Sequence, residues 1–181
     1  MNHADHVRLI GPGIDRGVGG HWADFGAGSG AFTLALRDLA GPNAHIIAVD
    51  HDRGRLRALH AEMARRFPGT RLQTLAADFA AELELPPLDG ILTANAIHYV
   101  PWREQEALLR RWRAHLKPDA RLIVVEYDAD AGNRWVPYPV SFTGLGPLAE
   151  AAGFAEPVLL GTVPSRFLGR MYAAMATATA T

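Results

Sequence analysis

Short apolar runs alternate with stretches of helical periodicity between residues 21 and 127, and this alternation constrains the fold more than any other feature. The run Ile46-Ile-Ala-Val49 contains no polar residue, which is typical of a strand covered on both faces. Strands that alternate with helices indicate a parallel sheet with crossover helices. We therefore expect an α/β fold with strands at 21–25, 44–50, 71–77, 88–94 and 120–127, and helices at 30–39, 52–67 and 102–116.

The alternation stops after residue 127. The segment 128–142 combines Pro137 and Pro139 with Trp135 and Tyr138, so it cannot be one regular element, and we expect a long aromatic loop. Beyond it we expect a short helix at 145–152, an antiparallel hairpin of strands at 155–162 and 166–174, and a frayed end at 176–181.

Composition limits the function classes. The 181 residues suit one domain, 1–181, in which residues 1–20 form a short N-terminal lid segment. A formal net charge of −1 with 49% hydrophobic residues argues against a disordered chain and a polybasic nucleic-acid binder. The absence of cysteine excludes disulfides, thiolate metal sites and a cysteine nucleophile. Because no apolar stretch reaches the roughly 18 residues of a membrane span, we expect a cytoplasmic protein with no membrane partner.

The segment Asp24-Phe-Gly-Ala-Gly-Ser-Gly30 lies where the first expected strand passes into the first helix. Alternate glycines allow a tight turn and the close approach of a ligand to the main chain. Asp50 ends the second expected strand, where a carboxylate can bind both hydroxyls of a ribose. These features predict a nucleoside pocket. The spacing Gly26-x-Gly28-x-x-Ala31 also satisfies the dinucleotide fingerprint, so this motif alone leaves a nicotinamide cofactor open.

Further segments follow in a familiar order. They are Trp22-Ala-Asp-Phe-Gly-Ala-Gly-Ser-Gly-Ala-Phe-Thr33, Ile46-Ile-Ala-Val-Asp50, Ala77-Asp-Phe79, Leu88-Asp-Gly-Ile-Leu-Thr-Ala-Asn-Ala-Ile-His-Tyr-Val100 and Leu116-Lys-Pro-Asp-Ala-Arg-Leu-Ile-Val-Val-Glu126. With these motifs the chain resembles the class I S-adenosylmethionine-dependent methyltransferases over about residues 20–175. The resemblance implies a doubly wound, mostly parallel seven-stranded sheet of Rossmann-like order 3-2-1-4-5-7-6, with strand 7 antiparallel and helices on both faces.

Two positions depart from the family pattern. Asp119-Ala120 stands where the family usually has two glycines before the fifth strand, which affects the turn more than the chemistry. Asn95-Ala-Ile-His98 stands where enzymes that methylate amide and exocyclic amine nitrogens have Asn-Pro-Pro-Tyr. We therefore expect no nucleic-acid partner and a small-molecule methyl acceptor.

The resemblance also implies how S-adenosyl-L-methionine would bind, with no metal. The glycine turn would lie under its methionine and ribose portions, with Asp24 near the ammonium group and Asp50 on the ribose hydroxyls. Adenine would contact Asp78 and Phe79. The remaining contacts would be His51 packed on the purine and the Asn95 carbonyl on the ammonium. The expected cofactor-binding set is Asp24, Gly26, Ala27, Gly28, Ser29, Gly30, Asp50, His51, Asp78, Phe79 and Asn95.

His98 follows the fourth expected strand, at the mouth of the substrate side. We expect it to be catalytic, as the base that deprotonates a phenol, hydroxyl or acidic carbon, and a solvated loop histidine is the alternative. Asp78 could instead cap the short helix expected after the third strand. The aromatics of 128–142 could line an acceptor pocket or pack as an ordinary loop. His3 and His6 have no third ligand nearby in the sequence, so we expect no metal site there.

Three functions remain from the sequence. The first is an S-adenosylmethionine-dependent methyltransferase for a small molecule, with the methylated atom unresolved. The second is a non-catalytic S-adenosylmethionine-binding sensor or partner protein. The third is an NAD(P)-dependent oxidoreductase. Such an enzyme would normally need a catalytic Tyr/Lys pair, and Lys117, the one lysine, lies far from the expected site. A short N-terminal lid leaves either an open cleft for a large acceptor or a homodimer whose second copy closes the site.

Overall fold

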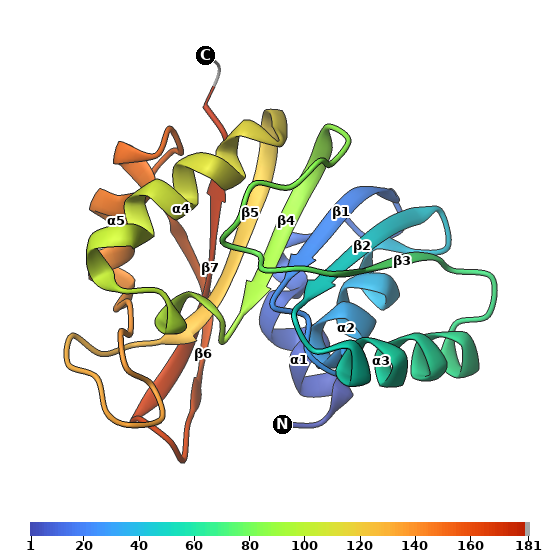
Figure 1. Cartoon of the computed structure of the whole chain (residues 1–181), viewed down its shortest axis with the longest axis horizontal. Helices are drawn as coiled ribbons and strands as arrows, with labels where there is room; N and C mark the ends of the chain where they lie inside the picture. The colour runs from blue at the N-terminus through green and yellow to red at the C-terminus, as the bar shows by residue number, and fades with distance from the viewer. Residues whose placement is uncertain (180–181) are drawn as a thin grey trace.

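The computed structural model describes residues 1–179, which fold around one seven-stranded sheet (Figure 1). The strands are β1 (Gly20–Phe25), β2 (Ala44–Asp50), β3 (Arg71–Ala76), β4 (Leu88–Ala94), β5 (Leu116–Tyr127), β6 (Val158–Pro164) and β7 (Arg170–Thr177). Their order is β3-β2-β1-β4-β5-β7-β6, and β7 runs antiparallel to both of its neighbours. The expected order and the antiparallel seventh strand are confirmed.

Helices cover both faces of the sheet. They are α1 (His3–Ile10), α2 (Ala31–Ala40), α3 (Arg53–Arg66), α4 (Trp102–Ala114) and α5 (Phe142–Ala151), with short 3-10 turns η1 (Gly11–Gly13) and η2 (Ile97–Tyr99). Figure 1 shows α1, α2 and α3 on one side and α4 and α5 on the other. Among the described residues, no helix combines the length and apolarity needed to cross a bilayer.

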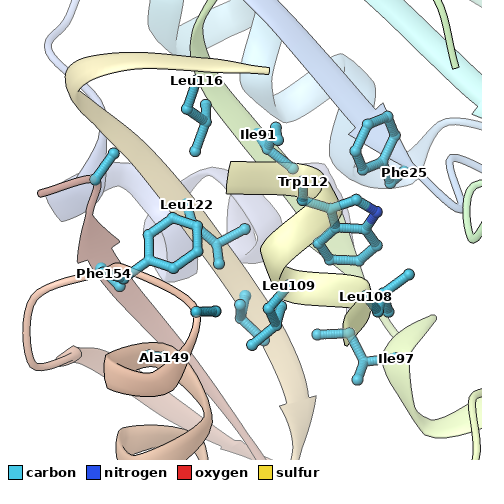
Figure 2. Close-up of a cluster of buried hydrophobic side chains, with 14 of the residues drawn as sticks. Phe25, Ile91, Ile97, Leu108, Leu109, Trp112, Leu116, Leu122, Ala149 and Phe154 are labelled. Carbon is cyan, nitrogen blue, oxygen red and sulfur yellow. The ribbon is translucent and has the colours of Figure 1, made fainter. Parts of the chain in front are cut away.

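Each face has its own hydrophobic core. On one face, Trp112 of α4 packs against Phe25 of β1 with ring centroids 5.1 Å apart, and Leu122 and Phe154 extend the cluster (Figure 2). On the other face, Ile10 and Leu36 pack with β-strand residues of the sheet centre. Burial on both faces explains why the central strands read as unbroken apolar runs.

The N-terminal lid segment contains a helix that the sequence analysis did not predict. Asn2 begins α1 with a capping box, in which its side chain accepts from the Asp5 N–H at 3.0 Å and its own N–H donates to the Asp5 carboxylate at 2.9 Å. Leu9 and Ile10 then bury the helix against the sheet and α2. The pattern Asn-x-x-Asp before an apolar pair was the available signal.

Several predicted boundaries were wrong. β5 begins at Leu116 because that residue pairs with Leu88 before a register shift, and α4 therefore ends earlier than expected. The hairpin strands start three and four residues later than predicted, at Val158 and Arg170, because residues 165–169 form the turn, which the Ser165 N–H closes on the Gly169 carbonyl. The last strand continues to Thr177, and residues 180–181 of the end expected to fray lie outside the described residues.

Candidate active site

The carboxyl ends of β1, β2 and β4 meet at one edge of the sheet because these strands are parallel neighbours. A cavity of about 410 Å³ opens there. Its lining includes nine of the expected cofactor-binding residues: Asp24, Gly26, Ala27, Gly28, Ser29, Asp50, His51, Phe79 and Asn95. The fold thus brings together residues from four separate sequence segments at the point where ligands bind in open α/β sheets.

The glycines of the β1–α2 turn have different tasks. Gly26, Gly28 and Gly30 all have positive φ, at 78°, 54° and 89°. A Cβ atom on Gly30 would lie 2.1 Å from Leu59 Cδ1, and one on Gly26 would lie 2.5 Å from Ala96 Cβ, so both glycines permit close packing. A Cβ on Gly28 would meet no atom within 4 Å, so this glycine keeps the cavity open. Gly30 is not among the residues that line the cavity, and its expected contact with the cofactor stays a prediction.

Asp50 joins the ends of β1 and β2. Asp50 is 5% exposed, and its carboxylate accepts hydrogen bonds from the Gly28 N–H and the Asp52 N–H, each at 2.8 Å. These two donors fix the carboxylate at the cavity wall. A carboxylate oxygen has more than one acceptor site, so these bonds leave room for the hydroxyls of a ligand.

Asp24 lies in the cavity floor and is 1% exposed. Burial raises the pKa of its carboxyl from 3.8 to about 7, although the hydrogen bond donated by Thr33 Oγ1 at 2.5 Å acts in the opposite direction. The negative charge of Asp50 adds to the rise in this pKa. A cation placed in the cavity would stabilise the ionised form of Asp24.

Asn95 follows β4 in the left-handed conformation, with φ of 54°. Its side-chain Oδ1 is buried and has no hydrogen-bond partner among residues 1–179, although Asn95 lines the cavity. A buried acceptor without a donor is costly.

The comparisons with known proteins agree with this geometry. Residues 23–119 match the family model described as a methyltransferase domain, which is more than half of the chain. This chain belongs to the class I S-adenosylmethionine-dependent methyltransferases. It is 30% identical over 123 residues to a probable cobalt-precorrin-6B C(15)-methyltransferase (decarboxylating) of Thermoplasma volcanium, covering 66% of this chain and 58% of that relative. The chain thus spans less than two thirds of the relative's length.

Solved methyltransferases share the fold. The Burkholderia thailandensis 1,6-didemethyltoxoflavin-N1-methyltransferase, solved with 1,6-didemethyltoxoflavin and S-adenosylhomocysteine, superposes with a TM-score of 0.77 at 22% identity, over 99% of this chain and 79% of that one. The magnesium protoporphyrin IX methyltransferase of Synechocystis, solved with S-adenosylmethionine, gives a TM-score of 0.71 at 16% identity, over 97% and 77% of the two chains. At these identities the likeness establishes the fold.

His98 does not lie at an open mouth, and that expectation was wrong. The side chain is 2% exposed and does not line the cavity. Its Nδ1 lies 3.0 Å from both carboxylate oxygens of Glu126, which is itself 0% exposed and also accepts from the His98 main-chain N–H at 3.2 Å. Tyr99 lines the cavity and packs its ring on His98, with centroids 4.2 Å apart. His98 therefore lies behind Tyr99, held by β5.

Asp78 also lies outside the cavity lining, whereas its neighbour Phe79 lies in it. The Asp78 side chain is exposed, and its Oδ1 accepts from the Ala80 N–H at 2.8 Å, so in this structure it caps a turn. The Phe79 carbonyl accepts from Trp112 Nε1 at 3.0 Å, which fixes the segment to α4.

Several residues of this cavity were not predicted from the sequence, chiefly Met1, His6, Arg55 and Tyr99. His6 lies on α1 and packs on Phe32 with ring centroids 4.6 Å apart. Burial lowers the pKa of its imidazole, and nearby positive charges lower it further. His6 was assessed only as a metal ligand, because nothing local in the sequence indicates that α1 folds back over the glycine turn.

A second cavity, of about 400 Å³, lies at the opposite edge of the sheet, beside the amino end of β1. Four of its charged side chains form ion pairs: Lys117 Nζ lies 2.7 Å from Asp89, and Arg121 lies 2.8 Å from Asp15. Asp119 also lines this cavity and forms no ion pair among residues 1–179.

Proposed function

We propose that the domain transfers a methyl group from S-adenosyl-L-methionine to a small-molecule acceptor. One observation carries the proposal: the Asp50 carboxylate and the bare backbone at Gly28 line the same cavity as Asp24 and Asn95. A hydroxyl acceptor, open main chain and a carboxylate beside an amide suit a nucleoside that carries an ammonium group.

The residues present fit this cofactor, which when bound supplies an electrophilic methyl group on a sulfonium. Asp50 would bind the ribose hydroxyls, and the turn at Gly26, Ala27, Gly28 and Ser29 would lie against the methionine and ribose. His51, 83% exposed at its side chain, is free to pack on the purine beside Phe79. Asp24 and Asn95 would share the ammonium group. Gly30, which does not line the cavity, would shape the turn that holds the cofactor.

Asp78 Oδ1 already accepts from the Ala80 N–H, so Asp78 would reach adenine through the remaining acceptor sites of its carboxylate. We keep an adenine contact for Asp78 as part of the proposal, with Phe79 as the residue that lines the cavity. The chain's task in the transfer is to align the acceptor with the methyl group and to exclude water from the cavity.

For the acceptor, the relatives supply the chemistry to try first. One relative is named for a cobalt-precorrin, one for 1,6-didemethyltoxoflavin and one for magnesium protoporphyrin IX. All three names denote small molecules with ring systems. We propose an acceptor of this size, with the methylated atom left open.

A base role for His98 requires the site to open towards its ring, because His98 is 2% exposed and does not line the cavity, whereas Tyr99, which packs on it, does. The bond to Glu126 places the ring hydrogen on Nδ1 and leaves Nε2 for the acceptor proton. If His98 is that base, His98→Ala lowers turnover and changes the affinity for S-adenosylmethionine less than about twofold. Equal turnover would return His98 to a structural role.

Calorimetric titration with S-adenosylmethionine, S-adenosylhomocysteine and NADH in parallel tests the proposal. We expect heat with the first two ligands only. No binding of S-adenosylmethionine would contradict both the enzyme and a non-catalytic sensor. Binding without any methylated product, when the protein and labelled cofactor are incubated with ring-containing metabolite extracts, would favour the sensor.

A further inference from the structure

β6 is the last strand of the sheet, next to β7 (Figure 1). Only one of its two sides is paired with another strand in the described part of the chain. The other side presents main-chain N–H and C=O groups that can pair with an added strand. The molecule thus carries an open sheet edge.

The two edges of the sheet are built differently. β3, at the other end, carries Arg71, Gln73 and Thr74, and such polar side chains discourage strand addition. β6 has the sequence Val-Leu-Leu-Gly-Thr-Val-Pro and contains no charged residue. Its Val158 and Leu159 are 57% and 46% exposed. The β6 edge therefore lacks the charged side chain that β3 carries, and its protection is limited to Pro164 at its end and a register shift between Leu159 and Gly161.

A groove of about 540 Å³ runs beside this strand, between α1 and the stretch 160–164 of β6. Leu9 and Leu160 supply apolar lining, and Asp5 and Arg8 supply one charge of each sign. A seven-residue strand alone buries less than the roughly 1,200 Å² of a stable interface, so a partner has to use this groove as well. Met1 borders both the groove and the candidate active-site cavity.

The charges that flank β6 suit a second copy of the same strand. Glu156 precedes the strand and Arg166 follows it, and both are exposed without an ion pair among residues 1–179. Both lie five positions from Gly161. If two copies pair antiparallel about a two-fold axis at Gly161, each Glu156 faces the Arg166 of the other copy. Parallel pairing would instead bring like charges together.

We propose that β6 of a second copy of this chain pairs antiparallel with β6 to form a two-fold dimer. The residues beside the second copy's β6 would lie in the groove next to α1. The inference is independent of the proposed function, since it rests on the strand edge, its exposed apolar residues and the flanking charges. Because Met1 belongs to both surfaces, the dimer would set the second chain against the helix that borders the cavity.

Analytical ultracentrifugation of the full chain across a concentration series tests the proposal. We expect the mass to rise from 19.6 kDa towards twice that value. Leu159→Lys, which adds a charge to the open edge, should raise the dissociation constant at least about tenfold. Val18→Lys is the matched control, because Val18 is 73% exposed near the opposite cavity, and it should leave the dissociation constant unchanged.

A charge exchange tests the antiparallel register. Glu156→Arg and Arg166→Glu should each weaken the dimer about fivefold, because each places like charges opposite one another at both ends. The double variant should return to within about twofold of the unaltered chain. Circular dichroism melting checks that all variants fold.

Three results would overturn the proposal. The first is a monomer at every concentration up to about 0.5 mM. The second is a dimer that Leu159→Lys does not weaken, which would place the interface on another face. The third is a dimer that Leu159→Lys weakens but the charge exchange does not restore, which would reject the two-fold antiparallel register.

Discussion

The Asp50 carboxylate accepts a hydrogen bond from the Gly28 N–H at 2.8 Å. This contact links the end of β2 to the glycine turn after β1, 22 positions apart in the sequence. The same carboxylate accepts from the Asp52 N–H, one residue before α3 begins. One buried side chain thus sets the shape of the turn and presents acceptor oxygens to the cavity.

Replacing Asp50 by Ala should weaken S-adenosylmethionine binding by about 1 to 3 kcal/mol, because ligand hydroxyls and two main-chain donors lose their acceptor. Isothermal titration calorimetry measures the change. Asp52→Asn is the matched control: Asp52 caps α3 from a side chain that is 44% exposed, and asparagine caps equally well. Unchanged affinity in Asp50→Ala would contradict the ribose contact.

Asp24 should make folding stability fall as pH rises. Its pKa is about 7 in the folded chain and 3.8 as an unperturbed group, so between these values the folded state binds more protons than the unfolded state. The free energy of unfolding therefore decreases from about pH 4 to pH 7, by on the order of 4 kcal/mol from this group alone, and then levels off. Urea unfolding of the unaltered chain and of Asp24→Asn at pH 5, 6, 7 and 8 measures this decrease in the free energy of unfolding.

Asp24→Asn keeps an acceptor for Thr33 and removes the titration. The difference in unfolding free energy between the variant and the unaltered chain should therefore grow in the variant's favour as pH rises to 7. A difference that stays constant with pH would show that Asp24 does not titrate in this range.

Gly30→Ala should mainly lower the stability of the fold, whereas Gly28→Ala should mainly lower the affinity for the cofactor. A Cβ on Gly30 collides with Leu59, and its φ is 89°, so this variant should lose about 2 to 5 kcal/mol of stability. A Cβ on Gly28 collides with nothing, so this variant should lose only the roughly 1 to 2 kcal/mol of a left-handed residue.

The methyl group of Gly28→Ala would instead occupy cavity space, and S-adenosylmethionine should bind at least about tenfold more weakly. Thermal melting and calorimetry on both variants separate stability from affinity. Cofactor affinity equal to that of the unaltered chain in Gly28→Ala would mean that the ligand does not pass over this backbone.

Local patterns predicted the central fold well, for physical reasons. The strands β2 and β4 were predicted with their observed bounds, because burial on both faces makes their apolar runs continuous. The glycine turn was predictable because positive φ at alternate positions demands glycine. The C-terminal hairpin was placed early, since its exposed β6 has no pattern of burial to mark its start.

What the sequence did not reveal depends on contacts between distant segments. His6 reaches the cavity because α1 packs on α2, and no local pattern reports that packing. Similarly, the position of His98 after β4 predicted a side chain at the mouth of the site. The side chain is instead buried against the carboxylate of Glu126, 28 residues later in the sequence. The strand that contains Glu126 was predicted from its apolar residues alone, and no role was considered for the Glu126 carboxylate.

The pair of His98 and Glu126 should be important for stability whatever its role in catalysis. Glu126 is fully buried and accepts from His98 Nδ1, from the His98 main-chain N–H and from the Tyr127 N–H. Glu126→Ala leaves three buried donors unpaired and should cost about 3 to 5 kcal/mol in urea unfolding. Glu150→Ala, at an exposed position of α5, is the control and should change the unfolding free energy by less than about 0.5 kcal/mol. A loss below about 1 kcal/mol in Glu126→Ala would mean that water or a rearranged turn satisfies these donors, and η2 would then not be anchored by β5.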